Sequence, residues 1–298
     1  MVTSPIRYVG GKHFMVKYIV PIIEAYEHTT YVEPFGGAAH ILLAKRRSKV
    51  EVYNDINDVV VNFFRVVADK EMCEELIRLV SILPYSRKLL DESKVAMHAE
   101  KDAVKRAAAF FIVSRQCFGG DVSAWSASWG YDVAARHQVS SWCECPQRLM
   151  DVHNRLQSVR IECFDFRKVF EEYDDAGTLF YCDPPYVLST RHGEYYEAEM
   201  SDRDHIELVD ILLRISGDAI VSGYSNEIYD KLTINGWMSV SMPSRCHLRT
   251  STGLSEKPRR TEVIWIHPRI AEAVDVKAII EKAMNKSNRS QKRRGNNG

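Results

Sequence analysis

The 298-residue chain lacks the features that mark exported or membrane-spanning proteins. No apolar run approaches the roughly 20 residues needed to cross a bilayer, and residues 1–7 contain no hydrophobic segment of a signal peptide. The seven cysteines are odd in number and irregularly spaced, which is typical of free thiols in a reducing compartment. These absences predict a cytoplasmic protein without a membrane partner.

Metal-binding and nucleotide-phosphate patterns are also missing. Cys143 and Cys145 lie close together with His137 and His153 nearby, but no second cysteine pair completes a zinc-like pattern. The segment 10–12, Gly-Gly-Lys, lacks the upstream glycine and the following Ser or Thr of a Walker A loop, and no G-x-G-x-x-G motif occurs. We therefore expect no metal and no dinucleotide cofactor.

The composition is that of an ordinary globular protein, with 45% hydrophobic and 27% charged residues. A formal net charge of zero excludes a protein that is basic all over. The charge is uneven, however, because residues 243–261 and 285–298 are rich in Lys and Arg and nearly free of acids. Both segments could contact phosphates without sequence preference, although a disordered basic terminus has the same composition.

Apolar runs alternate with helical patterns over much of the chain, which predicts an α/β fold with a doubly wound parallel sheet. Two later β-rich runs predict a C-terminal antiparallel hairpin around a positively charged loop. The expected parallel strands are 30–33, 49–53, 159–164, 178–182 and 219–224, the expected hairpin strands are 237–242 and 262–267, and the expected intervening helices are 37–47, 166–173 and 202–215.

The alternation is interrupted between residues 66 and 158, where the pattern predicts helices only. These helices are expected at 71–83, 86–97, 101–117 and 146–156, with a polar, aromatic loop at 118–131. We expect residues 66–158 to form a helical insertion that recognises the substrate. The catalytic domain would then comprise residues 1–65 and 159–270, followed by a C-terminal helix and a basic, disordered tail at 271–298.

The tetrapeptide Asp183-Pro184-Pro185-Tyr186 closes the apolar strand at 178–182. Its prolines stiffen the backbone where the chain leaves the sheet. A carboxylate, a main-chain carbonyl and an aromatic ring are thereby held in one arrangement. Such a group suits a planar heterocycle with an exocyclic amino group, because its two N–H groups can point at two acceptors. A Pro-rich turn after a strand is also a common structural element.

Three other expected strands end in residues suited to a ligand at the carboxyl edge of a parallel sheet. The Gly-rich turn 33–38 opens a helix, whose free N–H groups favour a carboxylate or phosphate. Asp55 ends the second strand, where an acid usually binds ribose hydroxyls, and Asp165 and Phe166 offer an acceptor and a ring for adenine. Both aspartates could instead be helix N-caps. Taken in order, the four strand ends predict a nucleoside-containing cofactor lying across the sheet.

These motifs resemble those of the Dam-like, D12-class DNA adenine N6-methyltransferases. The resemblance rests on the tetrapeptide 183–186, the turn 33–37 and the N-terminal segment 8–12, Tyr-Val-Gly-Gly-Lys. Their order matches the α arrangement of that family, and the likeness extends from about Ser4 to Pro268. Further matching segments are Asp55-Ile56-Asn57, Asp165-Phe166, residues 222–226 and residues 261–265.

The resemblance implies a Rossmann-like methyltransferase that transfers a methyl group from S-adenosylmethionine to N6 of a flipped-out adenine in double-stranded DNA. A cognate restriction endonuclease is left open as a second partner. The implied catalytic residues are Asp183, Pro184, Pro185 and Tyr186. The implied cofactor-binding residues are Tyr8, Gly10, Gly11, Lys12, Glu33, Pro34, Phe35, Gly36, Gly37, Asp55, Asp165, Phe166 and Asp183. Candidate DNA contacts are Arg191, Arg245, Arg249, Arg259, Arg260, Trp125 and Trp129, although loop charge and core packing explain these residues equally well.

One residue departs from the family pattern. The turn usually has the form Phe-x-Gly-x-Gly, and Ala39 stands where the second glycine is expected. Alanine fits this position if its φ is negative.

Two kinds of alternative function stay open. Methylation of adenine in RNA or of cytosine N4 would use the same chemistry, whereas Asp183 and the motif order favour adenine in DNA. A protein-glutamine methyltransferase would more usually carry Asn at position 183. A catalytically silent nucleic-acid-binding module belongs to a different class, and it would not need the intact acidic and aromatic positions.

Overall fold

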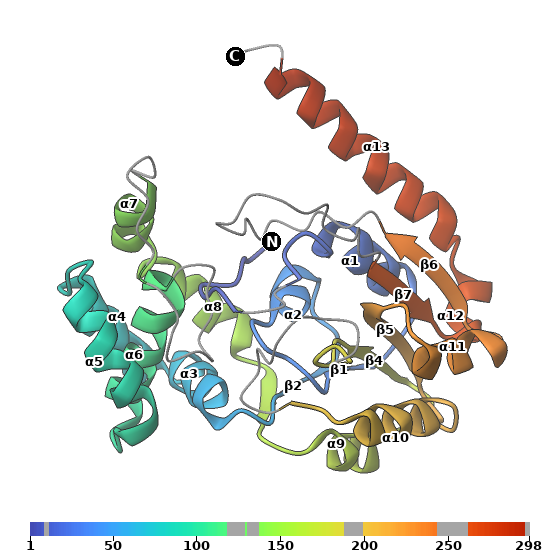
Figure 1. The fold of residues 1–298 in the computed structure, drawn as a ribbon, viewed down its shortest axis with the longest axis horizontal. Coiled ribbons are helices and arrows are strands. Elements are labelled where there is room, and N and C mark those ends of the chain that lie inside the picture. The colour runs from blue at the N-terminus through green and yellow to red at the C-terminus, as the bar shows by residue number, and fades with distance from the viewer. Residues whose placement is uncertain (9–11, 118–128, 130–136, 188–198, 243–261, 296–298) are drawn as a thin grey trace, which may run out of the picture.

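The computed structural model describes the chain except for residues 9–11, 118–128, 130–136, 188–198, 243–261 and 296–298, with side chains described as far as Asn285. The strands form one seven-stranded sheet in the order β3-β2-β1-β4-β5-β7-β6 (Figure 1). Among the described strands, β7 alone runs in the opposite direction to the others. The strands are β1 (Thr30–Glu33), β2 (Val50–Asn54), β3 (Val159–Glu162), β4 (Thr178–Cys182), β5 (Asp218–Tyr224), β6 (Met238–Met242) and β7 (Glu262–Ile266). This topology confirms the predicted α/β class and the antiparallel pairing of the last two strands.

Helices cover both faces of the sheet, with α1 and α2 on one side and α9 and α10 on the other (Figure 1). The helices are α1 (Val16–Ala25), α2 (His40–Ala44), α3 (Asp58–Ala68), α4 (Lys70–Ser81), α5 (Arg87–Ala99), α6 (Ala103–Gln116), α7 (His137–Glu144), α8 (Arg148–Leu156), α9 (Phe166–Tyr173), α10 (Asp202–Leu212), α11 (Glu227–Ile234), α12 (Pro268–Ala273) and α13 (Val276–Gly295).

The alternation of side chains along β4 explains why its sequence is apolar throughout. Leu179 and Tyr181 face the core shared with α1 and α2. Phe180 and Cys182 point the other way, into the core formed with α9 and α10. A strand buried on both faces carries a continuous hydrophobic run, which is the signal that locates the edge of the sheet where ligands bind.

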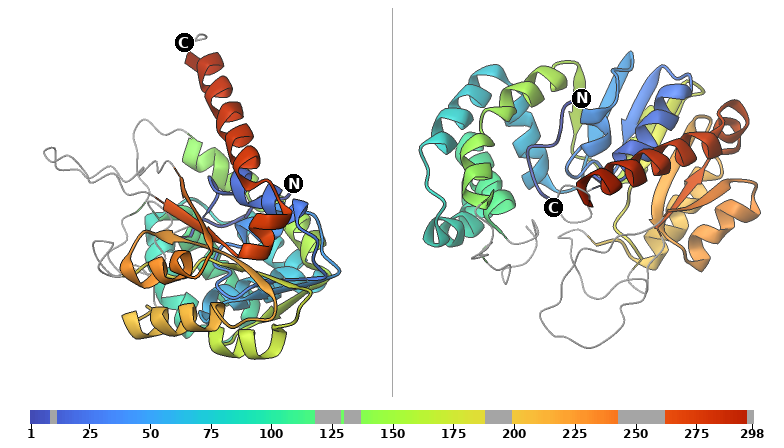
Figure 2. Two further views of the ribbon diagram at one scale, coloured as in Figure 1. Left: turned by 90° about the vertical axis from the view of Figure 1, so that its right-hand side faces the viewer. Right: turned by 90° about the horizontal axis from the view of Figure 1, so that it is seen from above.

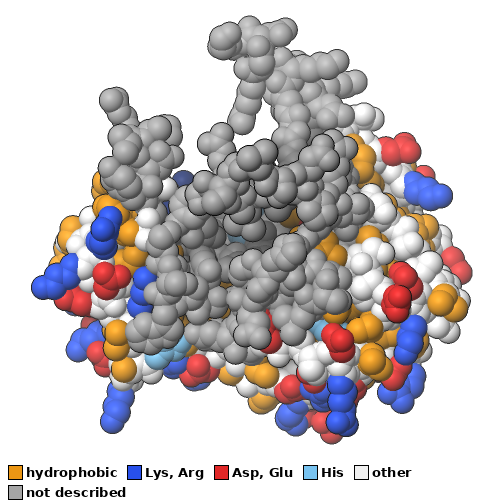
Figure 3. All heavy atoms as spheres, in the orientation of Figure 1, with side chains coloured by type: hydrophobic (Ala, Val, Ile, Leu, Met, Phe, Trp, Pro, Cys, Tyr) orange, Lys and Arg blue, Asp and Glu red, His pale blue; other side chains and the backbone are white. Residues whose placement is uncertain are grey.

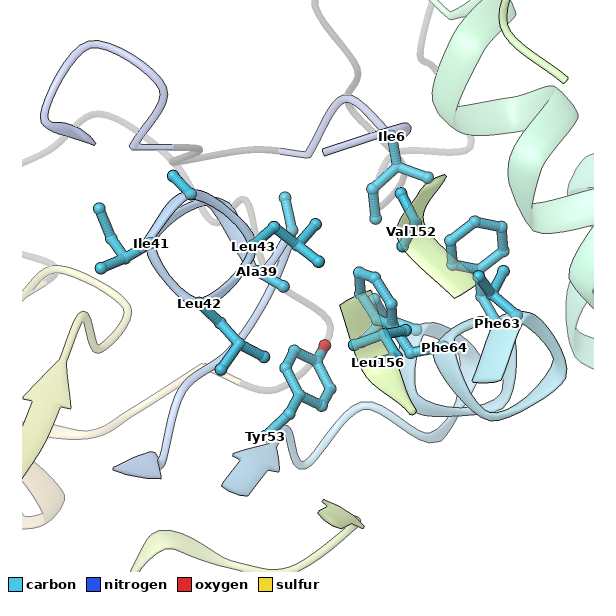
Figure 4. Packing of buried hydrophobic residues seen from close by; sticks show 14 of the residues in the cluster. Ile6, Ala39, Ile41, Leu42, Leu43, Tyr53, Phe63, Phe64, Val152 and Leu156 are labelled. Carbon is cyan, nitrogen blue, oxygen red and sulfur yellow. The ribbon is translucent and has the colours of Figure 1, made fainter. Parts of the chain in front are cut away.

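The helical insertion shares its core with the sheet. Phe64 of α3 packs against Tyr53 of β2 with ring centres 4.8 Å apart, and Phe63 lies in the same cluster as the α8 residues Val152 and Leu156 (Figure 4). Helix α3 also continues across the boundary predicted at residues 65 and 66. The insertion therefore extends the same hydrophobic cluster that covers one face of the sheet.

A buried ion-pair cluster fastens the insertion to the sheet. Glu51 of β2 accepts hydrogen bonds from Arg155 of α8 at 2.5 and 2.8 Å and from Lys45 at 2.5 Å. Arg155 also donates to the Leu42 carbonyl at 2.6 Å. The Glu51 side chain is only 1% exposed. The cost of removing its charge from water is therefore offset by the opposite charges of Arg155 and Lys45.

The C-terminal region contains helices α12 and α13. Helix α13 continues to Gly295 and projects from the body of the protein (Figure 2).

In the view of Figure 3, acidic and basic side chains are intermixed along the lower edge, where α9 and α10 lie. Across the described parts of the chain, no helix combines the length and hydrophobicity that a membrane span requires.

Candidate active site

A cleft of about 1060 Å³, part of it open to solvent, lies at the carboxyl ends of the parallel strands. The structure brings all four predicted strand ends to this one cleft. Its lining includes the predicted residues Tyr8, Lys12, Glu33, Pro34, Phe35, Gly36, Gly37, Asp55, Asp165, Phe166, Asp183 and Pro185. His40, Arg167 and Met200 also line it and were not predicted.

Two predicted catalytic residues lie beside the cleft without lining it. Pro184, which directly follows Asp183, is buried. Tyr186, three residues after Asp183, is half-buried. The other predicted residues, Gly10, Gly11, Trp125, Arg191, Arg245, Arg249, Arg259 and Arg260, fall outside the described part of the chain.

The turn after β1 approaches β2 so closely that Gly36 has no room for a side chain. The Gly36 N–H donates to the Asn54 carbonyl at 2.7 Å. A Cβ on Gly36 would lie 2.2 Å from a ring carbon of Tyr53, a residue that is itself fully buried. Glycine at position 36 is therefore required to form the wall of the cleft.

The same turn corrects the expectation for Ala39. Its φ is 54°, in the left-handed region, rather than negative, and Gly37 has a φ of 46°. A left-handed conformation costs a non-glycine residue about 1–2 kcal/mol. These two residues also explain why α2 begins at His40 and not at the predicted residue 37. The turn keeps the shape that glycine would give it, at the expense of local strain.

Asp55 is held by the backbone of both neighbouring segments. Its Oδ2 accepts from the Gly37 N–H at 2.8 Å and its Oδ1 from the Asn57 N–H at 2.9 Å. Burial raises the pKa of Asp55, and these two hydrogen bonds oppose the rise. Each carboxylate oxygen can accept a further hydrogen bond from a ligand in the cleft.

Asn54 ties three strand ends together, which the sequence analysis did not predict. Its side-chain amide donates to the carbonyls of Pro34 at 2.8 Å and Phe164 at 3.0 Å, and its oxygen accepts from the Phe164 N–H at 2.7 Å. The residue is fully buried. An amide at the end of an otherwise apolar strand was the available signal, because a buried polar side chain must find partners.

Asp165 is both an N-cap and a cleft residue, so its two interpretations are compatible. Its Oδ1 accepts from the Arg167 N–H at 2.9 Å at the start of α9. The Arg167 guanidinium contacts both Asp165 oxygens at 3.1 Å and lies 4.4 Å from the centre of the Phe166 ring. Phe35 packs against Phe166 with ring centres 5.5 Å apart. This end of the cleft is an aromatic wall with an acid beside it.

At the other end, Asp183 is anchored from two directions. Its Oδ1 accepts from Lys12 Nζ and from Ser222 Oγ, each at 2.9 Å. Burial raises the pKa of Asp183 to about 6, and the neighbouring Lys12 ammonium and Ser222 hydroxyl limit the rise. The carboxyl group is therefore mostly ionised at neutral pH.

Lys12 extends this network to Tyr186 and Glu262. Lys12 Nζ lies 3.1 Å from a Glu262 oxygen and donates to the Tyr186 hydroxyl, which in turn donates to Glu262. The Tyr186 ring meets Tyr224 edge to face, with centres 4.4 Å apart. Ser222 and Glu262 were not predicted as site residues, although their segments carried part of the family resemblance. Only the fold shows that they meet Asp183 and Tyr186.

Glu33 is a second carboxyl group with an altered pKa. It is 2% exposed and accepts a hydrogen bond from the Tyr31 hydroxyl at 2.7 Å. Burial raises its pKa to about 8 despite that bond. Glu33 therefore lines the cleft in its neutral form at pH 7.

Trp129 is the one predicted DNA contact that the structure describes. Its ring lies 5.4 Å from that of Tyr85 and 4.9 Å from the Arg87 guanidinium, and its backbone bridges Cys117. The side chain is half-buried. Its role in binding DNA stays a prediction.

A mostly parallel seven-stranded sheet with one reversed strand and a cleft at its carboxyl edge defines a Rossmann-like methyltransferase fold. Residues 8–244, well over half of the chain, match the family of D12 class N6 adenine-specific DNA methyltransferases. The chain belongs to this family.

The chain is also similar to three curated type II methyltransferases. It is 29% identical to M.MjaIII of Methanocaldococcus jannaschii over 196 residues, which cover 60% of this chain and 66% of that protein. It is 25% identical to M.FokI of Planomicrobium okeanokoites over 77% of this chain and 36% of that protein. For M.CviBI of Paramecium bursaria Chlorella virus NC1A the identity is 21%, over 76% of this chain and 85% of that protein. The match thus spans just under two thirds of M.MjaIII and about a third of M.FokI.

Proposed function

We propose that this chain is an S-adenosylmethionine-dependent DNA methyltransferase that modifies the N6 amino group of adenine. The observation that carries the proposal is the anchored carboxylate of Asp183 in the cleft at the carboxyl ends of the parallel strands. Membership of an adenine-specific family supports the choice of base.

The residues of the cleft fit the proposed cofactor. Asp55 offers acceptors for ribose hydroxyls, while Asp165 and the Phe166 ring suit the adenine edge and face. The turn at Gly36 and Gly37 brings the backbone close enough to contact the methionine part. When bound, the cofactor would supply an activated methyl group on a positively charged sulfur.

The charge of the cluster at the catalytic end also fits a cationic donor. One ammonium, that of Lys12, lies between the carboxylates of Asp183 and Glu262. Among the described side chains of this largely buried cluster, two acids therefore face a single base. This surplus of acid favours a positively charged ligand nearby, since charges interact strongly where water is excluded.

Asp183 and the Pro184 carbonyl would bind the two N–H groups of the target amine. The lone pair of an aromatic amine is delocalised into its ring, so the nitrogen is a poor nucleophile. Two acceptors placed beside the N–H groups favour a more pyramidal nitrogen, whose lone pair can attack. Positioning and electrostatic stabilisation would then supply most of the rate enhancement.

Tyr186 would stack on the target base after the base leaves the duplex. Its hydroxyl is bonded to Lys12 and Glu262, and its ring and that of Tyr224 meet edge to face. These contacts hold the ring in one orientation. The proposed stacking surface is thus fixed before the substrate binds, which lowers the entropy cost of binding.

The proposal is tested by methyl transfer from tritium-labelled S-adenosylmethionine to double-stranded DNA, with RNA and protein as parallel acceptors. Digestion of the product DNA to nucleosides should place the label in N6-methyldeoxyadenosine. Label in N4-methyldeoxycytidine, RNA or protein would contradict the proposed substrate. Absence of transfer to all acceptors would contradict the proposed activity, provided that calorimetry shows the cofactor bound.

A further inference from the structure

The two oxygens of the Asp183 carboxylate have different surroundings. Lys12 and Ser222 both bind Oδ1, each at 2.9 Å. Among the described residues, none forms a hydrogen bond with Oδ2. The side chain keeps 17% of its surface exposed and lines the cleft. One oxygen is thus occupied by the protein and the other is available to a ligand.

The bond from Ser222 has a defined direction. An ionised carboxylate can only accept, so the Ser222 hydroxyl must donate to Asp183. Ser222 Oγ also lies 3.0 Å from the Tyr181 hydroxyl. Because the Ser222 proton is committed to Asp183, Tyr181 must donate to Ser222. The three residues form a chain with one polarity, from Tyr181 through Ser222 to Asp183.

The sheet sets the position of Ser222. Cys182 of β4 pairs with Val221 of β5, so the next residues along the two strands, Asp183 and Ser222, lie beside each other. Ser222 is also paired with Ile264 of β7 on its other side and is fully buried. Its hydroxyl is therefore held on a rigid element, unlike a donor on a surface loop.

We propose that Ser222 is a positioning residue for methyl transfer: by binding Oδ1 it fixes the plane of the Asp183 carboxylate and leaves Oδ2 to accept the N–H of the target amine. The inference rests on the proposed function and adds a residue to it. The terminal torsion of an Asp side chain is broad, so one anchor would leave the carboxylate free to turn. Lys12 and Ser222 approach from different elements, and together they define its orientation.

The test compares Ser222→Ala and Ser222→Thr with the unchanged protein. Ser93→Ala is the matched control, because Ser93 is another buried serine, on α5 and outside the cleft. Each protein is titrated with S-adenosylmethionine to count competent sites. The values of kcat, KM for DNA and cofactor Kd are then measured as a function of pH.

Ser222→Ala should lower kcat about 10- to 100-fold, the effect of losing one hydrogen bond to a charged group, while cofactor Kd changes less than about threefold. Loss of the donor also removes a contact that lowers the pKa of Asp183. The acidic limb of the kcat profile should therefore move to higher pH. Ser222→Thr, which keeps the hydroxyl, should recover most of the lost rate, and Ser93→Ala should match the unchanged protein.

Two results would overturn the inference. One is a kcat for Ser222→Ala within about twofold of the unchanged protein, counted per competent site. The other is an equal loss at every pH with no shift of the acidic limb and no recovery in Ser222→Thr. Failure of the unchanged protein to methylate adenine in DNA would be a separate result, which contradicts the proposed function itself.

Discussion

The ammonium nitrogen of Lys12 lies 2.9 Å from the Oδ1 atom of Asp183, so an N-terminal lysine and an acid that follows a central strand form one buried ion pair. Lys12 also lies 3.1 Å from a Glu262 oxygen. The pair joins the N-terminal segment to the carboxyl edge of β4. It also keeps Asp183 ionised at neutral pH although the group is largely buried.

Methyl transfer should fail as the pH falls through about 6. The pKa of Asp183 is raised to about 6, and a proton added to Oδ2 below this pKa would prevent that oxygen from accepting the N–H of the target amine. Because the Lys12 ammonium lowers this pKa, Lys12→Met should move the acidic limb of kcat/KM to higher pH. The pH profile of kcat/KM is measured for both proteins between about pH 5 and about pH 9. An acidic limb near the ordinary pKa of Asp in either protein would count against this role.

The stability of the fold should decrease as the pH rises through the window set by Glu33. Its pKa is about 8 in the folded protein and 4.5 in the unfolded chain, so the folded state binds more protons between these values. The free energy of unfolding should then fall by up to about 1.4 kcal/mol per pH unit in this window. Urea denaturation at several pH values measures this free energy of unfolding.

Glu33→Gln provides the control for this pH dependence. Glutamine keeps an oxygen that can accept from Tyr31 and has no ionisable group. The variant should lose most of the decrease between the pKa of Asp183, about 6, and that of Glu33, about 8, while the raised pKa of Asp183 still contributes below that range. An unchanged slope in Glu33→Gln would assign the effect to another group.

Gly36→Ala should damage both the fold and the cleft. The added Cβ would lie 2.2 Å from the buried Tyr53 ring, and overpacking of this kind costs about 1–3 kcal/mol. Cofactor binding, measured by calorimetry on folded protein, should weaken as the turn shifts. Gly177→Ala is the matched control, because its nearest neighbour atom is 3.5 Å from the added Cβ. Equal stability of the two variants would show that the turn is not tightly packed.

Arg155→Met should destabilise the protein by about 3–5 kcal/mol, because Glu51 would lose a partner inside the core. The exposed pair formed by Arg46 and Glu24 provides a comparison. Arg46→Ala should change the free energy of unfolding by less than about 1 kcal/mol. Chemical denaturation of the two variants gives both values. A small effect of Arg155→Met would mean that the insertion is held by apolar packing alone.

The sequence located the strands well because most of them are buried. The bounds of β1, β4 and α9 agree with the predicted ranges. In contrast, α3 was missed although Asp58, Asn62 and Arg65 recur at helical spacing, because its run of Val and Phe residues also suits a strand. Helix α1 was missed as well, and it contains Pro21, a residue that usually ends a helix.

The candidate site was predictable wherever its chemistry lies at a strand end. Glu33 ends a strand and Asp55, Asp165 and Asp183 each follow one, and parallel topology brings such residues to one edge. The roles of Ser222, Glu262 and Asn54 depend on partners far away in the chain, which local patterns cannot reveal. The left-handed φ of Ala39 was missed for a related reason, since tertiary packing overrides the preference of alanine.

Single-turnover methyl transfer by Asp183→Ala tests most directly whether the Asp183 carboxylate binds the target amine. Cofactor binding should be weakened but still measurable by calorimetry, while labelled methyl transfer to adenine in double-stranded DNA should be abolished. Full transfer by Asp183→Ala would contradict the proposal that this acid binds the target amine.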